Sequence, residues 1–423
     1  MNPERLVAGL DIGSSRTTAI IAEAVGDFPH APSLKILGVG NARTAGMRRG
    51  VVSDIKETTQ SIQKAMREAE RMAGVQVDGV YAGIAGEHVE AMSSSGVVAV
   101  NGDEVTRSDI DRANEVARTQ PIPTDRELLH AIPQEYRVDR NAGIRDPVGM
   151  SGMRLETEMY LVTIGSSPAL NLRKSIERAG YKVRELVLEP LASSFAVVTD
   201  EEKELGVALV EMGAGTTDLA IFHEEKIRFL GTIAYGGAHV TSDIVHGIGV
   251  TQADAERLKE KYGCAYEPFF EHSDEVITLP STVAQGDREI KRELLAHIIH
   301  QRMDEIFGLV NQQIRDSGFA GRLSAGVVLT GGAAAIMGAA ELASDVFGTG
   351  ARVGSPAARV GGLSDAVEAP RFSTAVGLAL FGAHRMSLGG VGSVVSGRRK
   401  AMSSSGVDRV AQSVKTWLQD FFS

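Results

Sequence analysis

The sequence predicts an α/β fold made of two related lobes. Apolar runs of strand length alternate with amphipathic stretches of helical period along most of the 423 residues, as expected for sheets covered by helices. The stretch from Leu6 to Ile21 recurs 200 residues later, from Gly206 to Ile221, with apolar, acidic, glycine and hydroxyl positions in the same order. Between the two copies, short apolar runs and several prolines interrupt the pattern, which predicts an inserted subdomain.

The first lobe is expected to begin with two strands, Leu6–Leu10 and Thr17–Ala24, around a Gly-Ser turn. Ser53 is expected to cap a helix that Gly74 ends, because apolar residues lie between them at helical spacing. Val80–Ala85 is the next expected strand, and it leads into the inserted subdomain.

The later elements follow the same signals. The inserted subdomain is expected to contain a helix near Ser108–Arg118, and the apolar run Leu161–Gly165 returns to the core. Apolar residues at helical spacing predict a long helix over Asp287–Ser317. Gly and Ser make up eleven of the twenty residues from Ser387 to Gly406, which predicts a flexible linker.

These signals divide the chain into parts with the following predicted boundaries. The first lobe comprises residues 1–84, 161–204 and 370–385, with the inserted subdomain at 85–160; the second lobe comprises 205–245 and 325–369, with its own subdomain at 246–324; a linker at 386–406 and an amphipathic helix at 407–423 complete the chain.

The C-terminal segment has an apolar stripe at three- and four-residue spacing, which predicts a helix that lies in a membrane interface. The side chains expected to contact lipid are Val410, Val414, Trp417, Leu418, Phe421 and Phe422. Basic residues before the stripe would add attraction to anionic lipid. A helix that docks on the protein body or on a partner is the alternative.

Composition excludes several classes of protein. The net charge of −10 argues against a large nucleic-acid-binding surface, which needs clustered Lys and Arg. Cys264 is the only cysteine, so a disulfide framework and a cysteine-based metal site are excluded and a buried thiol is expected. His297 and His300 lie one helical turn apart without a third ligand, so no metal is assigned to them. Charged residues near the N-terminus leave no export signal, and a cytoplasmic location is expected.

The two copies of the repeat suit phosphate binding. In each, an acid at the end of a strand, Asp11 or Glu211, precedes a glycine by two positions, Gly13 or Gly213, and a turn with hydroxyl side chains follows. Glycine lets the backbone approach a ligand, and the turn presents N–H groups to phosphate oxygens. A single copy is often only a turn, but one copy in each lobe indicates a triphosphate clamped between lobes, with both acids holding water-coordinated Mg²⁺.

A third element is the pair Gly331 and Gly332 followed by Ala333, after an apolar strand and before an expected helix. The missing side chains would let a nucleoside lie against the backbone, and close packing of strand and helix is the alternative. Neither the P-loop nor the dinucleotide-binding motif occurs in the sequence.

These motifs together resemble the actin-like ATPase superfamily. The two hairpins, the glycine pair and two connecting segments, residues 188–193 and 372–378, occur in the order of that superfamily. Within it, residues 133–139 and 146–156 resemble the inserted subdomain, called 1C, of the bacterial cell-division family FtsA.

The resemblance implies ATP and Mg²⁺ as ligands, and it implies a role for Glu189 in orienting the attacking water. The nucleotide-binding positions that it implies are Asp11, Gly13, Ser14, Ser15, Thr17, Gly213, Ala214, Gly215, Thr216, Thr217, Glu256, Lys259, Gly331, Gly332 and Ala333. For Glu256 and Lys259 a solvated helix face is an equal alternative. Glu211 and Ala214 replace the usual Asp and Gly, so binding with at most slow ATPase activity is expected.

The resemblance also implies a function: an ATP-binding protein that polymerises at the cytoplasmic face of the inner membrane, at the septum, tethers the FtsZ ring and recruits later division proteins through 1C. The C-terminal tail of FtsZ is expected near the start of the long helix, at Arg288, Lys291, Arg292 and Arg302, unless these form only a solvated face. Two alternatives stay open, a sugar or acid kinase of the same fold and a scaffold of a type IV pilus system similar to PilM, which should lack the C-terminal helix.

Overall fold

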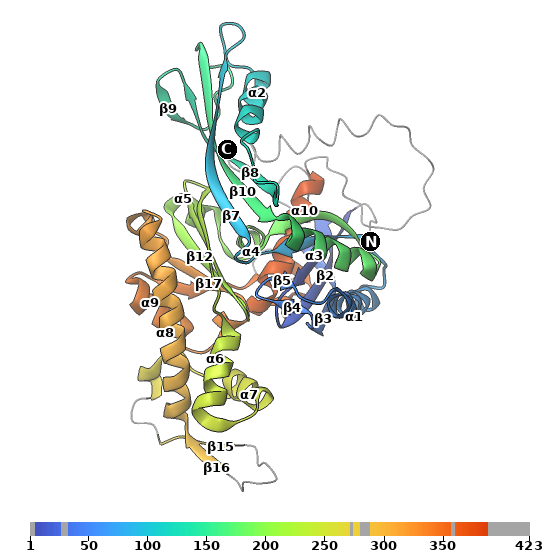
Figure 1. The fold of residues 1–423 in the computed structure, drawn as a ribbon, viewed down its shortest axis with the longest axis vertical. Coiled ribbons are helices and arrows are strands. Elements are labelled where there is room, and N and C mark those ends of the chain that lie inside the picture. Colours follow the sequence, from blue (N-terminus) through green and yellow to red (C-terminus); the bar gives the residue numbers. More distant parts are fainter. Residues whose placement is uncertain (1–4, 27–32, 271–273, 280–287, 357–359, 388–423) are drawn as a thin grey trace.

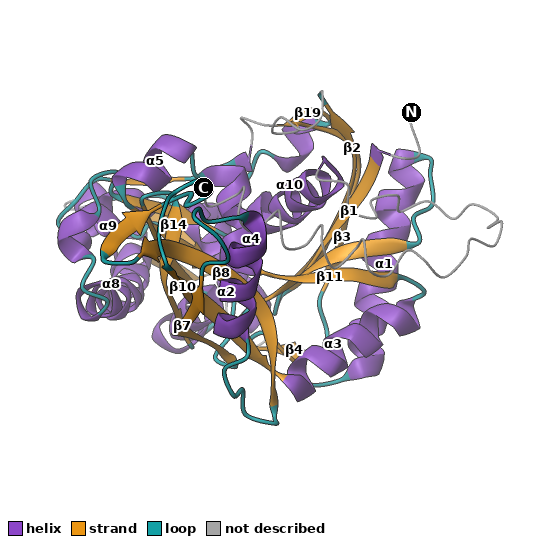
Figure 2. Cartoon of the chain, turned by 90° about the horizontal axis from the view of Figure 1, so that it is seen from above, coloured by secondary structure: helices purple, strands orange, loops and turns teal. Residues whose placement is uncertain are grey.

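The computed structural model describes residues 5–26, 33–270, 274–279, 288–356 and 360–387. Two lobes lie side by side, each with a central sheet, and the inserted subdomain extends from one end of the molecule (Figure 1). Seen from above, helices α4 (Glu189–Val197) and α10 (Ser373–Ser387) lie between the two sheets (Figure 2).

The first lobe contains a six-stranded sheet in the order β11-β6-β1-β2-β3-β19. Its strands are β1 (Leu6–Ile12), β2 (Arg16–Val25), β3 (Ser33–Arg43), β6 (Gly79–Ile84), β11 (Lys182–Leu188) and β19 (Val360–Gly362). The first three strands are antiparallel, and β6, β11 and β19 each run parallel to a neighbour. Helices α1 (Ile55–Ala73) and α3 (Ser166–Ala179) cover one face, and α10 covers the other. A short hairpin of β4 (Met47–Arg48) and β5 (Val51–Val52) precedes α1.

The second lobe repeats this plan, as the sequence repeat predicts. Its sheet has the order β14-β13-β12-β17-β18, with three antiparallel strands followed by two parallel ones. The strands are β12 (Val207–Met212), β13 (Thr217–His223), β14 (Lys226–Ile233), β17 (Val327–Thr330) and β18 (Ala351–Val353). The helices around them are α5 (Asp200–Leu205), α6 (Gly237–Ile244), α7 (Gln252–Tyr262), α8 (Arg292–Asp316) and α9 (Ala339–Phe347), and a hairpin of β15 (Val276–Leu279) and β16 (Arg288–Lys291) lies at the far end.

The inserted subdomain is an antiparallel sheet in the order β7-β10-β8-β9 with one helix on it, α2 (Arg107–Arg118). Its strands are β7 (Val89–Ala99), β8 (Arg126–Val138), β9 (Asn141–Ile144) and β10 (Arg154–Gly165). Strand β10 is continuous through Leu161, so the last strand of this sheet leads directly into α3 of the first lobe.

Helices α4 and α10 cross at very short range. A Cβ atom on Gly377 would lie 1.9 Å from the carbonyl oxygen of Ala192, so only glycine permits this approach. All eleven residues of α10 from Ser373 to Ala383 are buried, as are Pro190–Val197 of α4. The two connecting segments that the sequence singles out are therefore packed on each other in the centre of the molecule.

Three local expectations need correction. Asp54, not Ser53, caps α1, because its side chain accepts a hydrogen bond from the Glu57 N–H at 2.9 Å, whereas Gly74 ends the helix in the left-handed region as expected. The helix expected over Asp287–Ser317 begins at Arg292, because Arg288–Lys291 pairs with β15 as a strand. The glycine pair opens a 3₁₀ turn, and α9 begins only at Ala339.

Two further expectations concern accessibility and the membrane. Cys264 is buried and free, as expected. The predicted linker and amphipathic helix, residues 386–406 and 407–423, lie outside the described residues from 388 onward. In the described part of the chain, no helix combines the length and the apolar character needed to cross a membrane.

Candidate functional site between the two lobes

The two repeated hairpins have the same geometry and face each other. The N–H of Gly13 donates to the carbonyl of Arg16 at 3.0 Å, and the N–H of Gly213 donates to the carbonyl of Thr216 at 2.9 Å. A Cβ atom on Gly215 would lie 2.9 Å from the Ser14 Oγ atom, so the turn of one lobe touches the turn of the other. The structure thus brings both predicted phosphate hairpins to one place.

Most hydroxyl groups of the hairpins already have protein partners. Thr17 is hydrogen-bonded to Thr44 at 2.7 Å, Thr216 donates to Asp218 at 3.0 Å, and Thr217 donates to the carbonyl of Tyr235 at 2.9 Å. Ser14 accepts from the N–H of Gly50 at 3.4 Å, and Ser15 is exposed. The threonines therefore hold the turns in shape, and Ser15 is the hydroxyl that faces solvent.

The second hairpin packs against the beginning of α6. The N–H groups of Gly237 and Ala238 donate to the carbonyls of Gly213 and Ala214, both at 2.9 Å. A Cβ atom on Gly236 would lie 2.5 Å from the carbonyl oxygen of Gly213, so glycine is needed for this contact.

The glycine pair and the α7 residues lie beside the second hairpin. Gly331 has a φ of 87°, and a Cβ atom there would lie 2.5 Å from the carbonyl oxygen of Met212. Lys259 is 8% exposed, and its Nζ atom donates to the Gly237 carbonyl at 3.0 Å, to Thr241 at 2.8 Å and to Glu256 at 2.8 Å. The alternative of a solvated helix face is therefore wrong for Lys259.

Four carboxyl groups from both lobes interact at the centre of the site. Burial raises the pKa of Asp11 from 3.8 to about 8, with a further contribution from the charge of Glu211. Burial raises the pKa of Glu211 from 4.5 to about 7 and that of Asp218 from 3.8 to about 6. The pKa of Glu189 is raised well above its usual value by burial and by the charges of the other three.

Three of these acids contact side chains or backbone of other elements. Glu211 accepts hydrogen bonds from Ser193 of α4, at 2.8 Å, and from Thr374 of α10, so both connecting helices bind one carboxylate. Asp218 accepts from Thr232 at 2.7 Å as well as from Thr216. Glu189 packs on β6, where a Cβ atom on Gly83 would lie 2.8 Å from its Cγ atom.

This arrangement fits a divalent cation that is held indirectly. Carboxylates that repel one another in a buried space are stabilised by a nearby positive charge. The described residues contain no group of three or more acidic, histidine or cysteine side chains that could hold a metal directly. Asp11 and Glu211 are the carboxylates that could hold such an ion through its water molecules.

Sequence reasoning missed three residues of this cluster. Asp218 stands one position after the second hairpin's Thr217, where the first copy has Thr18, so comparison of the two copies draws no attention to it. Ser193 and Thr374 belong to the two connecting segments, but only the contact with Glu211 gives each a role.

The four basic residues predicted to bind a partner do not form one exposed surface. Arg292 pairs with Glu275 at 2.9 Å, and Arg302 pairs with Asp243 at 3.1 Å, so both are held in ion pairs. Arg288 donates to the carbonyl of Ile248 at 2.7 Å. The side chain of Lys291 is 61% exposed and lies 3.8 Å from the fully exposed Asp274.

Comparison with known proteins shows which family this chain resembles. The family described as "Cell division protein FtsA" matches residues 208–377, and "SHS2 domain inserted in FTSA" matches residues 86–163. Cell division protein FtsA of Pseudomonas aeruginosa is 39% identical over 418 residues, which cover 99% of this chain and 98% of that relative. The chain belongs to the FtsA family. FtsA of Escherichia coli K12 is 38% identical over 385 residues, covering 89% of this chain and 90% of its own.

Solved structures show that the fold is actin-like. The PilM component of a PilM–PilN type IV pilus biogenesis complex matches with a TM-score of 0.61 at 18% identity and covers 89% of this chain and 98% of its own. MreB5 of Spiroplasma citri bound to ADP matches with a TM-score of 0.51 at 15% identity, covering 90% and 97%. At these identities the likeness concerns the fold alone, so the resemblance to PilM does not compete with the FtsA family.

Proposed function

We propose that the chain binds Mg²⁺-ATP between its lobes and uses the bound state to polymerise as a cell-division scaffold on the membrane. The observation that carries the nucleotide site is the contact between the two glycine hairpins, one from each lobe, beside the acid cluster. Backbone N–H groups of the turns suit phosphate oxygens, and the missing side chains at Gly331 and Gly332 suit a nucleoside that lies against the backbone. Membership of the FtsA family supports the division role.

The residues of the site would divide the chemistry between them. Asp11 and Glu211 would orient water around the metal, and Lys259 would fix Glu256 and the start of α6 beside the nucleoside. Bound Mg²⁺ would neutralise phosphate charge. Glu189 would orient the attacking water, and in the nucleotide-free protein burial and the charges of the other three acids raise its pKa.

Calorimetry with Mg²⁺-ATP tests the nucleotide site. Gly13→Asp and Gly332→Asp should each weaken binding at least about tenfold, because a carboxylate placed against phosphate or nucleoside repels or blocks the ligand. Gly350→Asp is a matched control, since nothing lies within 4 Å of a Cβ atom there and the residue is exposed. Equal affinities in all three variants and the wild type would place the nucleotide elsewhere.

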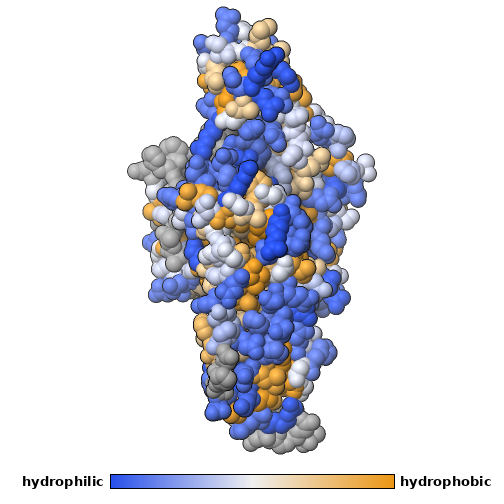
Figure 3. Space-filling view, turned by 90° about the vertical axis from the view of Figure 1, so that its left-hand side faces the viewer, coloured by the Kyte–Doolittle hydropathy of each residue, from blue (hydrophilic) through white to orange (hydrophobic). Residues whose placement is uncertain are grey.

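The partner and membrane proposals concern the two ends of the chain. The C-terminal tail of FtsZ would dock at the far end of the second lobe, where Lys291 and three exposed apolar side chains lie, Phe269, Val276 and Leu294. Polar and apolar side chains are interspersed toward this lower end of the surface (Figure 3). The predicted helix 407–423 would anchor the chain at the cytoplasmic face of the inner membrane at the septum, and 1C would recruit later division proteins.

Liposome flotation tests both ends at once. Truncation after Gly406, or Trp417→Glu, should abolish flotation with anionic vesicles, because the apolar stripe is lost or interrupted. An FtsZ tail peptide should float with the wild-type protein, and less peptide should float with Lys291→Glu. The difference between the two proteins should be larger at low salt than at high salt. Flotation of the truncated chain like the full chain would refute the anchor, and equal capture of the peptide by Lys291→Glu would refute the docking site.

A further inference from the structure

The inserted subdomain contains two segments that the sequence singles out and that the nucleotide site does not use, residues 133–139 and 146–156. Residues 133–138 of the first segment belong to β8, which packs against β10 through most of its length. Strand β8 also contacts both lobes through two buried side chains, His130 and Gln134, which are 4% and 5% exposed. These two contacts give the strand a role beyond its own sheet.

His130 reaches the strand that leads to Glu189. Its Nε2 atom accepts a hydrogen bond from the backbone N–H of Leu188 at 3.1 Å, and both groups are buried. An imidazole nitrogen that accepts a hydrogen bond carries no proton, so the ring is neutral. Burial, with a contribution from Arg385, lowers the pKa of His130 to about 3, which keeps this acceptor available at every pH at which the protein would work.

Leu188 is the residue at which β11 ends and α4 begins. It has φ −58° and ψ 126°, and no side chain caps the helix. In the described sheet β11 is the last strand, paired only with β6, so the His130 ring supplies a partner that no neighbouring strand provides. Glu189 is the next residue, and the direction of its side chain depends on the backbone that His130 holds.

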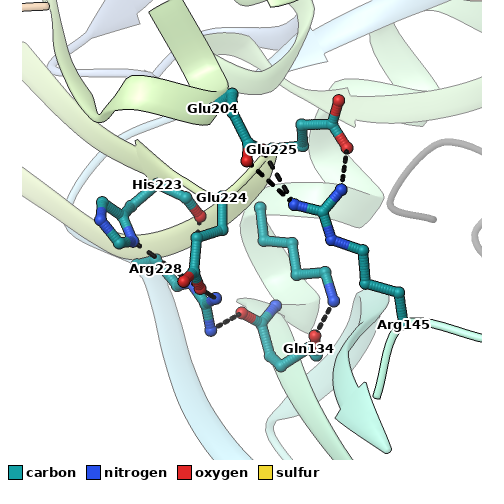
Figure 4. A network of polar contacts seen from close by, with 8 residues as sticks. Gln134, Arg145, Glu204, His223, Glu224, Glu225 and Arg228 are labelled. Carbon is teal, nitrogen blue, oxygen red and sulfur yellow. Dashed lines mark hydrogen bonds and ion pairs between the residues drawn. The ribbon is translucent and has the colours of Figure 1, made fainter. Parts of the chain in front are cut away.

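Gln134 fixes the same strand to the second lobe (Figure 4). Lys226 of β14, 6% exposed, donates to the carbonyl of Gln134, and Arg228 donates to its Oε1 atom at 3.4 Å. Strand β14 pairs with β13, which carries Asp218. Residues 130–134 of β8 therefore connect the junction before Glu189 in one lobe to the β13–β14 hairpin of the other lobe.

We propose that His130 is a positioning residue for the nucleotide site, and that β8 thereby makes the placement of Glu189 depend on where the inserted subdomain sits. This inference rests on the proposed binding of Mg²⁺-ATP. A partner that moves the inserted subdomain would then alter turnover without touching the nucleotide.

Hydrogen exchange of the nucleotide-free full chain tests the contact itself. In His130→Ala the backbone amide of Leu188 should exchange at least about tenfold faster, because the imidazole nitrogen that accepts its hydrogen bond is gone. His130→Gln should restore protection, since a glutamine oxygen can accept the same bond. Leu128→Ala is the control in the same strand, because the Leu128 side chain is 36% exposed and has no group that could accept the Leu188 N–H. Unchanged exchange at Leu188 in His130→Ala would overturn the proposal.

Turnover tests the role, with calorimetry beside it. In His130→Ala the rate of phosphate release should fall at least about tenfold, while the affinity for Mg²⁺-ATP stays within about twofold of that of the wild type. His130→Gln should recover most of the rate. In a Glu189→Ala background, His130→Ala should have no further effect on turnover, because the group that it positions is absent.

Three further outcomes would overturn the inference. One is an equal loss of rate with Glu189 present or absent, and another is a wild-type rate in His130→Ala despite faster exchange at Leu188. The third is a wild-type protein that binds Mg²⁺-ATP and releases no phosphate over a day, since there would be no water to orient. Failure of the wild type to bind Mg²⁺-ATP would instead refute the proposed function, and the exchange measurement would still report whether His130 holds Leu188.

Discussion

At the scale of single residues, the centre of the molecule is defined by carboxyl groups that are costly to bury. Asp11, Glu189, Glu211 and Asp218 come from both lobes and from a connecting helix, and their pKa values are all raised. Two of them were predictable from the repeat, because each ends a strand before a glycine. The family resemblance implied Glu189 at the same site, whereas Asp218 could not be predicted, since its place beside the others depends on tertiary packing.

The raised pKa values make the stability of the nucleotide-free protein depend on pH. Unfolded, Asp218 titrates near 3.8, and in the folded state its pKa is about 6, so between these values the folded state binds more protons than the unfolded one. The free energy of unfolding therefore falls as pH rises through this window, and Glu211 and Asp11 extend the fall to about pH 8. Asp218→Asn should flatten the dependence between about pH 4 and 6, as measured by urea denaturation at each pH. An unaltered slope in the variant would show that Asp218 is not the group responsible.

At the scale of elements, the sequence predicted the duplicated strands and hairpins well, because the repeat and the alternation of apolar residues are local signals. The start of α8 was misplaced because Arg288–Lys291 lacks a local signal that separates helix from strand, and its pairing with β15 decides the outcome. The contact of His130 with Leu188 was also out of reach, since 58 residues separate them in the chain. Local pattern thus gives the elements, and their junctions depend on tertiary contacts.

The crossing of α4 and α10 at Gly377 should be intolerant of any side chain. Gly377→Ala would place its Cβ atom against the backbone of Ala192 and should lower the free energy of unfolding by about 1–3 kcal/mol, because neither helix backbone can move freely. Gly308→Ala is the matched control: Gly308 lies in the exposed part of α8 with nothing within 4 Å, and the change should stabilise by up to about 1 kcal/mol. Denaturation in urea measures both, and equal stabilities for the two variants would contradict the close crossing.

At the scale of the whole molecule, the inserted subdomain bridges the two lobes, so it belongs to neither alone. Strands β7 and β10 connect the subdomain to the first lobe along the chain. Gln134 of β8 and Arg145 after β9 form hydrogen bonds with residues of the second lobe. Arg145, just after β9, binds Glu204 at 3.0 and 3.1 Å and Glu225 at 3.5 Å (Figure 4). A change in the angle between the lobes must therefore break these contacts or move the subdomain with them.

Arg145→Glu should loosen this bridge without unfolding either lobe. The pairs of Arg145 are about half exposed, so their loss should cost only about 1 kcal/mol or less, but the new carboxylate would also repel Glu204 and Glu225. Hydrogen exchange in α5 and in the turn between β13 and β14 should rise, more at low salt than at high salt. Arg154→Glu is the control, because Arg154 is similarly exposed but pairs with Glu156 inside the subdomain. If both variants changed exchange in the second lobe equally, or neither did, the Arg145 pairs would not hold the subdomain to that lobe.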